Sequence, residues 1–218
     1  MENAKGVAVK ALIACEFSGI VRGEFLRHGH QAVSCDLLPS EVPGPHIQGD
    51  VMDILNDGWD LLISFPPCTH LCVSGARWFK DKRVEQEQAL EFVRVLLAAP
   101  VPHIALENPV GIISTRIRPP DQVLQPYQFG HGECKATCLW LKNLPPLMPT
   151  HADDDLFVPP TPAGREQRVF KMPPGPNRWK ERSRTFSGVS QAMASQWPAW
   201  IGKYPTPMPL DLAGAVGT

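Results

Sequence analysis

The sequence contains no apolar run that approaches the ~20 residues needed to cross a bilayer, so we expect no transmembrane helix and no membrane partner. It has no recognisable targeting segment either, and we expect a cytoplasmic protein whose six cysteines are reduced thiols. An excess of one charge is also absent: 21 Lys and Arg residues face 22 Asp and Glu residues. This balance does not favour nucleic-acid binding by the whole chain, but it is compatible with a local basic patch.

The composition is that of a globular protein. Of the 218 residues, 43% are hydrophobic and 20% are charged, which excludes wholesale disorder, and we find no internal repeat. The 24 prolines are about twice the usual share, and most of the excess follows Pro145. We therefore predict a core over residues 1–144, a small irregular appendage, proline-rich and basic, over 145–185, a returning helix over 186–204 and a mobile tail over 205–218.

The hydrophobic pattern of the first part alternates between strands and helices. Buried strands are predicted at residues 7–14, 31–35, 59–65 and 103–106, helices at 19–30, 84–98 and 188–200, a loop at 39–49, and a β pair at 123–129 and 137–141. This alternation predicts an α/β fold with an open, mostly parallel sheet.

In such a sheet, ligands bind outside the carboxyl ends of the strands. The residues predicted at that edge are Cys15-Glu16-Phe17-Ser18-Gly19, Asp36, Asp50, Phe65-Pro66-Pro67-Cys68 and Glu107-Asn108-Pro109. Several carboxylates, a small residue and a cysteine would converge there. A nucleoside-containing cofactor and a nucleophile would require such a combination.

Each of these residues also has a purely structural interpretation. Gly19 is compatible with an ordinary turn, and Asp36 and Asp50 with side-chain caps of turns or helices. Cys68 is compatible with a small buried apolar residue, and Glu107 with a solvated strand end. The functional interpretation depends on their order and spacing together.

The most specific pattern is Pro66-Pro67-Cys68 at a strand end, followed about forty residues later by Glu107-Asn108-Pro109. With this pattern the chain resembles the cytosine-C5 DNA methyltransferases, specifically short phage and prophage members, over about residues 10 to 200. The resemblance implies a Rossmann-like S-adenosylmethionine-dependent methyltransferase fold. It also implies that Cys68 is the nucleophile, that Glu107 contacts the cytosine ring and that Asn108 lies beside the substrate.

The same resemblance implies the cofactor contacts. Phe17-Ser18-Gly19 is similar to the family's cofactor loop, Asp36 would bind the ribose hydroxyls, and Asp50 would lie near the adenine amino group. Pro66 would border the cofactor, and Ser190 belongs to a segment similar to the last family motif.

The sequence departs from the family pattern at three places. Ile20-Val21 follows Gly19 where a second glycine is usual, Pro109 follows Asn108 in place of valine, and Lys135-Ala136-Thr137 stands where Arg-x-Arg is usual. Lys135 would then supply one positive contact to the substrate. Its ammonium group is a point charge, so it cannot form the planar bidentate hydrogen bonds of an arginine guanidinium.

The residue chemistry is consistent with the implied reaction. C5 of cytosine is a poor nucleophile, and addition of a thiolate to C6 makes it enamine-like. A neighbouring acid that holds a proton at N3 would make C6 more electrophilic, which requires a pKa raised by burial. Cys68 and Glu107 are the residue types that these two steps need.

The appendage carries a basic cluster with few acidic neighbours. Its cationic residues are Arg165, Arg168, Lys171, Arg178, Lys180, Arg182 and Arg184. We interpret them as phosphate contacts, with Trp179 or Phe170 stacking on a base; the alternative is a solvated charged loop. Because only residues 145–185 stand where related proteins have a separate recognition domain, we expect low sequence specificity for DNA. Four possibilities for substrate and assembly stay open: recognition of a short sequence context, action on single strands, a partner subunit, and a homo-oligomer.

Other functions stay open at this point. Phe65 before Pro-Pro and Cys68 after it disfavour an exocyclic amino-methyltransferase. Cys68, His70 and Cys72 are metal-ligand types, but their spacing matches no standard zinc site, so we predict no metal. A catalytically silent DNA-binding module and C5 modification of a free pyrimidine nucleotide remain as alternatives.

Overall fold

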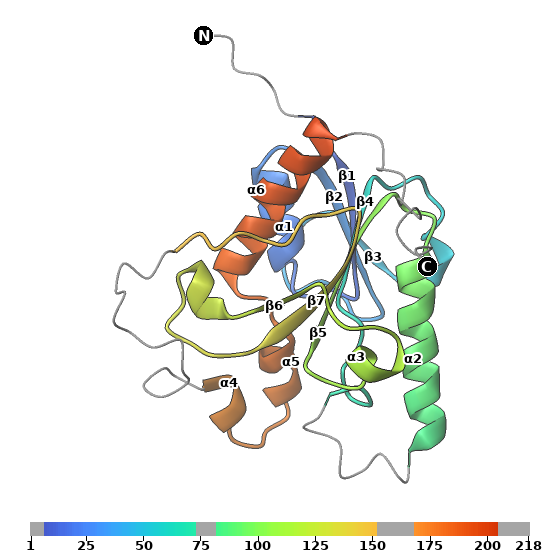
Figure 1. The fold of residues 1–218 in the computed structure, drawn as a ribbon, viewed down its shortest axis with the longest axis vertical. Coiled ribbons are helices and arrows are strands. Elements are labelled where there is room, and N and C mark those ends of the chain that lie inside the picture. Colours follow the sequence, from blue (N-terminus) through green and yellow to red (C-terminus); the bar gives the residue numbers. More distant parts are fainter. Residues whose placement is uncertain (1–6, 73–81, 152–167, 205–218) are drawn as a thin grey trace, which may run out of the picture.

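The computed structural model describes residues 7–72, 82–151 and 168–204 (Figure 1). The strands are β1 (Lys10–Ala14), β2 (Gln31–Asp36), β3 (His46–Gln48), β4 (Leu61–Ser64), β5 (His103–Pro109), β6 (Gln122–Leu124) and β7 (Thr137–Lys142). The helices are α1 (Ile20–Arg27), α2 (Arg83–Ala98), α3 (Ile113–Arg116), α4 (Arg168–Lys171), α5 (Arg178–Ser183) and α6 (Ser187–Lys203), with short 3-10 turns at Val51–Asp53 and Pro126–Phe129.

The described strands form one seven-stranded sheet in the order β3-β2-β1-β4-β5-β7-β6. Neighbouring strands from β3 to β5 are parallel, and β7 runs antiparallel to both β5 and β6. This confirms the predicted α/β class with a mostly parallel sheet, and the order is compatible with a Rossmann-like fold. Strand order reverses between β1 and β4, so a ligand site is expected beyond the carboxyl ends of these two strands.

Alternate residues of the central strands face two separate apolar layers. Ile13 of β1 packs in the cluster of α1 and α6, whereas its neighbour Leu12 packs in the cluster of α2. The helices accordingly cover both faces of the sheet, α1 and α6 together on one face and α2 on the other (Figure 1). Burial on both faces explains why β1 and β4 read as continuous apolar runs.

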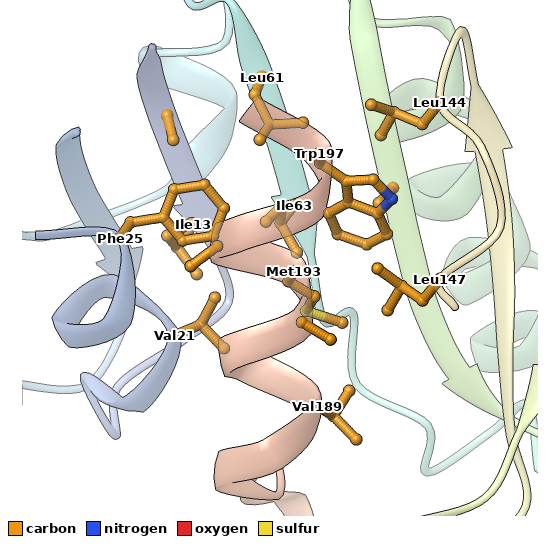
Figure 2. Packing of buried hydrophobic residues seen from close by; sticks show 14 of the residues in the cluster. Ile13, Val21, Phe25, Leu61, Ile63, Leu144, Leu147, Val189, Met193 and Trp197 are labelled. Carbon is orange, nitrogen blue, oxygen red and sulfur yellow. The ribbon is translucent and has the colours of Figure 1, made fainter. Parts of the chain in front are cut away.

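Helix α6 closes the first of these layers. Figure 2 shows Trp197 beside Leu144 and Leu147, while Phe25 and Val21 lie on the other side of α6. The Trp197 side chain is fully buried, and its Nε1 donates to the carbonyl oxygen of Pro145 at 3.1 Å. The predicted final helix is therefore confirmed as α6. Through Trp197 it is joined to the segment that follows β7.

Two local predictions were wrong. The expected loop at 39–49 contains β3, since His46–Gln48 adds to β2 in parallel. The expected strand at 123–129 ends at Leu124, because Pro126 starts a 3-10 turn that a capping box of Gln125 and Gln128 stabilises. Part of the expected irregular appendage is helical, in α4 and α5, and the expected mobile tail lies outside the described residues.

None of the helices in the described ranges has both the length and the apolar character needed to span a bilayer.

Candidate active site

A cavity of about 100 Å³ lies at the carboxyl edge of the sheet, at the reversal point of the strand order. Ala14, Ser64 and Leu106 are level in the register of β1, β4 and β5, so the residues that follow them emerge side by side. The lining residues are Cys15, Glu16, Phe17, Ser18, Phe65, Pro66, Pro67, Cys68, Glu107, Asn108, Pro109, Lys135, Arg182, Ser183 and Thr185. The residues of the Pro-Pro-Cys and Glu-Asn patterns thus line one site.

A tight turn carries Cys68. Its carbonyl oxygen accepts hydrogen bonds from the amides of Leu71 and Cys72, both at 3.0 Å. The amide of Ile112 in turn donates to the carbonyl oxygen of Leu71 at 2.9 Å. A Cβ on Gly111 would lie 2.1 Å from that same oxygen, so glycine is required for this close approach. The segment after β5 therefore fixes the turn on which the thiol sits.

The environment of Cys68 raises the pKa of its thiol above the ordinary value. A hydrogen bond with Cys72 raises its pKa most, burial and the charge of Glu107 raise it further, and Lys135 opposes them. Because the thiolate is the nucleophilic form, Cys68 is unreactive in this state until its proton is removed.

Glu107 is surrounded by protein but keeps part of its surface open. Burial raises the pKa of this carboxyl group, against the charge of Lys135 and a hydrogen bond from Thr137. A carboxyl group with a raised pKa remains a hydrogen-bond donor at higher pH than an ordinary one. The pKa of Glu107 is therefore shifted upward, which is the direction that the expected acid beside a cytosine ring requires.

The loop after β1 is held by Glu16. Its Oε1 atom accepts from the Ser18 hydroxyl and from the amide of Val21, each at 2.9 Å, so it caps α1. Gly19, the N-cap residue, has φ 71° and no side chain with which to cap. A Cβ there would lie 2.4 Å from Val42 Cγ2 and 2.6 Å from an Arg22 nitrogen. Backbone conformation and packing thus explain Gly19, and its cofactor contact stays a prediction.

Asp36 and Asp50 lie beyond the cavity, and each caps a local turn. Asp36 accepts from the amide of Leu38 at 2.9 Å, and Asp50 from the amide of Met52 at 3.0 Å. Both carboxylates help to raise the pKa of Cys15, which lines the cavity, to about 12, although burial contributes more. The two acids are therefore close enough to this side of the cavity to act electrostatically on it, and their cofactor contacts stay predictions.

Exposed apolar side chains accompany these acids. Leu37, directly after Asp36, is 73% exposed, and Met52 is 41% exposed. The Gly49 amide donates to the Asp36 carbonyl oxygen at 2.9 Å, which joins the two segments. Carboxylates next to apolar surface suit a ligand that has both hydroxyl groups and a planar ring.

Ser190 is fully buried in α6 and does not line the cavity. Its hydroxyl donates to the carbonyl oxygen of Ser187 at 2.8 Å. The start of α6 is fixed by His131, whose Nε2 accepts from the amide of Gly188 at 3.0 Å. A Cβ on Gly188 would lie 1.9 Å from the carbonyl oxygen of Phe129. This segment thus has a structural role, and the cofactor contact of Ser190 stays a prediction.

The basic residues of the appendage divide into two groups. Three have partners within the protein: Arg184 pairs with Glu41 at 2.6 Å and Glu181 at 3.2 Å, Arg168 pairs with Glu133 at 3.0 Å, and Arg178 donates to the Met172 carbonyl oxygen at 2.8 Å. Arg182 lines the cavity, and Lys180 lies 5.7 Å from the Phe17 ring. Arg165 and the side chain of Phe170 lie outside the description.

Helix α5 is docked at the cavity. Lys135 Nζ donates to the main-chain oxygen of Arg182 at 3.0 Å, and the rings of Trp179 and Phe17 lie 5.8 Å apart. Trp179 is nevertheless 52% exposed. The described end of the appendage is thus a wall of the site, which the sequence did not predict.

Sequence reasoning assigned no role to Cys15, Glu16, Thr137, Ser183 or Thr185. Cys15 and Glu16 belong to a strand-end segment that the pattern did identify. Thr137 ends the Lys135-Ala136-Thr137 segment that was compared with Arg-x-Arg, but no role was assigned to it. Ser183, the last residue of α5, and Thr185 carried no sequence signal, because only the packing of α5 brings them to the site.

No protein-family model matches this chain, and no curated protein matches it significantly. Within the ranges that the structure covers, no group of three or more His, Cys, Asp or Glu side chains is placed to hold a metal ion. None of the six cysteines, all of which are described, forms a disulfide.

Proposed function

We propose that the protein transfers a methyl group from S-adenosylmethionine to C5 of cytosine in DNA, within a Rossmann-like methyltransferase fold. The observation that carries this proposal is that Cys68 and Glu107 line one cavity together with Lys135. The resemblance names the first two residues as nucleophile and acid.

The residues present fit the proposed cofactor. Asp36 and Asp50, next to the exposed side chains of Leu37 and Met52, suit a ribose and a purine, and the buried Glu16 carboxyl group suits a positively charged end. The cavity is smaller than the ~300 Å³ at which small-molecule sites usually begin, so only the reacting end would enter it. When bound, S-adenosylmethionine would supply an electrophilic methyl group on a sulfonium centre.

The protein's own residues would act on the cytosine. Cys68, after losing its proton, forms a bond to C6 and thereby breaks the aromaticity of the ring. Glu107 holds a proton at N3, which stabilises the charge that develops there, so that C5 becomes nucleophilic. After methylation, a base or a water molecule takes the proton from C5, and the electron pair of that C–H bond forms the C5–C6 double bond. The bond between C6 and Cys68 breaks with its electron pair on sulfur, so the thiolate is released and the ring becomes aromatic again. Lys135 would favour the thiolate, since its charge lowers the pKa of Cys68.

A second candidate is C5 modification of a free pyrimidine nucleotide. Arg184 and Arg168 are paired with carboxylates, which leaves fewer cations of the described appendage for a DNA backbone. A single nucleotide needs fewer phosphate contacts than a DNA strand.

Transfer of labelled methyl groups to DNA and to dCMP distinguishes these functions. We expect the wild-type protein to label DNA but not dCMP, and Cys68→Ser to lose this transfer. The control is Cys134→Ser, which should stay active because Cys134 is buried outside the cavity. DNA that carries 5-fluorocytosine should form a stable adduct with Cys68, because fluorine at C5 replaces the hydrogen whose loss completes the reaction. Full activity of Cys68→Ser would rule out this mechanism, and binding of DNA without transfer would indicate a silent module.

A further inference from the structure

Glu16 lines the cavity, and one of its two carboxyl oxygens is buried without a partner among the described residues. The residue directly follows the turn after β1, is only 5% exposed and lines the cavity. Oε1 accepts two hydrogen bonds, from Ser18 and Val21, whereas Oε2 is buried and has no hydrogen-bond partner among the described residues. A buried polar atom without a partner carries a substantial desolvation cost.

The capping role of Glu16 does not account for Oε2. One oxygen is sufficient to accept from the amide of Val21 and from the Ser18 hydroxyl. The charge of Arg22 acts on Glu16, but no hydrogen bond or ion pair joins the two side chains. The two terminal guanidinium nitrogens of Arg22 donate to the Ser34 hydroxyl at 2.8 Å and to the Val42 carbonyl oxygen at 2.9 Å. No ion pair within the described chain neutralises Glu16, so a residue that lines the cavity has one hydrogen-bond acceptor that the described protein leaves unused.

The chemistry of this acceptor selects one group of the proposed cofactor. In many α/β proteins, the amides at the N-terminus of the first helix bind an anionic ligand group. Here Glu16 already occupies the start of α1, so a ligand carboxylate would meet a carboxyl group instead of free amides. A protonated amine is a donor and a cation, and it would satisfy Oε2 in both respects.

We propose that Glu16 is the acceptor for the protonated amine at the amino-acid end of S-adenosylmethionine, an inference that rests on the proposed function. Glu16 would thereby position the reacting end of the cofactor next to Cys68. Ligands that lack the amine would lose this contact and leave Oε2 unsatisfied.

Calorimetric binding of S-adenosylhomocysteine and of its deaminated analogue tests this inference without any turnover. In the wild-type protein, loss of the amine should weaken binding about 10- to 100-fold, the range expected for a hydrogen bond between charged groups. Glu16→Gln keeps one oxygen for the α1 cap but places an amide nitrogen at the other position. This variant should bind S-adenosylhomocysteine more weakly by a similar factor, and its affinity for the deaminated analogue should be unchanged.

Glu24→Gln is the matched control. Glu24 also lies on α1, is 4% exposed and has a buried Oε2 atom without a partner, but it pairs with Arg27 and does not line the cavity. This variant should bind both ligands as the wild-type protein does.

Two results would overturn the inference alone: equal affinity of the wild-type protein for both ligands, or an unchanged affinity ratio in Glu16→Gln. In either case S-adenosylhomocysteine still binds, and the proposed cofactor stands. If the wild-type protein binds neither ligand, the proposed cofactor fails and the inference fails with it. The comparison of the two ligands on the wild-type protein needs no variant, so it decides the question even if Glu16→Gln does not fold.

Discussion

The side-chain amide of Asn108 donates a hydrogen bond to the carbonyl oxygen of Pro66 at 2.8 Å. Asn108 is 1% exposed, so this contact joins the end of β5 to the residue that follows β4 by two positions, inside the protein. The resemblance placed Asn108 at the substrate. The geometry gives it a structural role, which is to hold the turn that carries Cys68. Asn108 also lines the cavity, and its contact with the substrate stays a prediction.

Asn108→Ala leaves the Pro66 carbonyl oxygen without this donor. We expect a loss of about 1–3 kcal/mol in the free energy of unfolding, and a larger proportional loss in the rate of methyl transfer, because the Cys68 turn loosens. Thermal melting and single-turnover transfer measure the two effects separately. The control is Asn143→Ala: Asn143 donates to the carbonyl oxygen of Pro102 at 2.7 Å, away from the cavity. If both variants lose activity equally, Asn108 does not position the nucleophile.

Cys72→Ala should make Cys68 more reactive. The hydrogen bond with Cys72 is the largest cause of the raised pKa of Cys68, so its removal lowers that pKa. At any pH below the pKa, the thiolate fraction then increases, and alkylation by iodoacetamide should accelerate. Mass spectrometry of the peptide that contains Cys68 follows the rate as a function of pH.

The control for this experiment is Cys35→Ala. Cys35 is buried, and its pKa is also raised, to about 11, but it is not among the groups that act on Cys68. Its removal should leave the pH profile of Cys68 in place. A profile that is unchanged in Cys72→Ala, or that moves to higher pH, contradicts the prediction.

The sequence predicted the sheet and which segments meet at its carboxyl edge, because both follow from local patterns. A strand that is buried on both faces has a continuous apolar sequence. Pro66-Pro67 predicts the end of the third strand at Phe65, and β4 ends one residue earlier, at Ser64. Given a parallel sheet, the convergence of the segments at Glu16, Cys68 and Glu107 follows from strand direction alone. The sequence therefore predicts which residues lie at the ends of the strands, but not which side chains or main-chain groups they contact there.

Partners that lie far apart in the sequence account for the rest. Arg184 was predicted to contact phosphate, but Glu41 pairs with it across 143 positions, and nothing in either local sequence indicates this. The start of α6 likewise depends on a distant partner, because the amide of Gly188 donates to Nε2 of His131, 57 positions earlier in the sequence. The strand β3 was missed because prolines and glycines around it indicate a loop, whereas pairing with β2 stabilises only three residues there.

Glu107→Gln should change how stability depends on pH. Because burial raises the pKa of Glu107 in the folded state, the folded protein must bury a charged group once the pH exceeds that pKa. Below the unfolded pKa both states are protonated and the cost is absent; it develops as the pH rises through the folded pKa and is complete above it. Glutamine stays neutral, so the melting temperature of the variant relative to the wild type should increase from acidic to alkaline pH.

The control for this comparison is Glu91→Gln, whose carboxylate is exposed on α2 and pairs with Arg94. Its melting temperature relative to the wild type should show no such increase. A constant or falling difference for Glu107→Gln would mean that the carboxyl group is not destabilised by burial.

The two groups of basic residues predict different effects on DNA binding. Arg182 lines the cavity, and Lys180 lies 5.7 Å from the ring of Phe17, which also lines it. Neither cation has a carboxylate partner among the described ion pairs, whereas Arg184 pairs with Glu41 and Glu181. Arg182→Ala retains the contact with Lys135, because that contact uses the main-chain oxygen. Fluorescence anisotropy of a labelled cytosine-containing oligonucleotide, measured over a series of salt concentrations, gives the number of phosphates neutralised.

Each of Lys180→Ala and Arg182→Ala should weaken binding and reduce the slope of log K against log salt by about one, the value for one lost phosphate contact. Arg184→Ala should leave this slope nearly unchanged and lower the melting temperature instead, because it frees α5 from Glu41. If Arg184→Ala reduces the slope as much as Arg182→Ala does, the pairing with Glu41 gives way to DNA, as the sequence-based assignment of Arg184 to phosphate predicts.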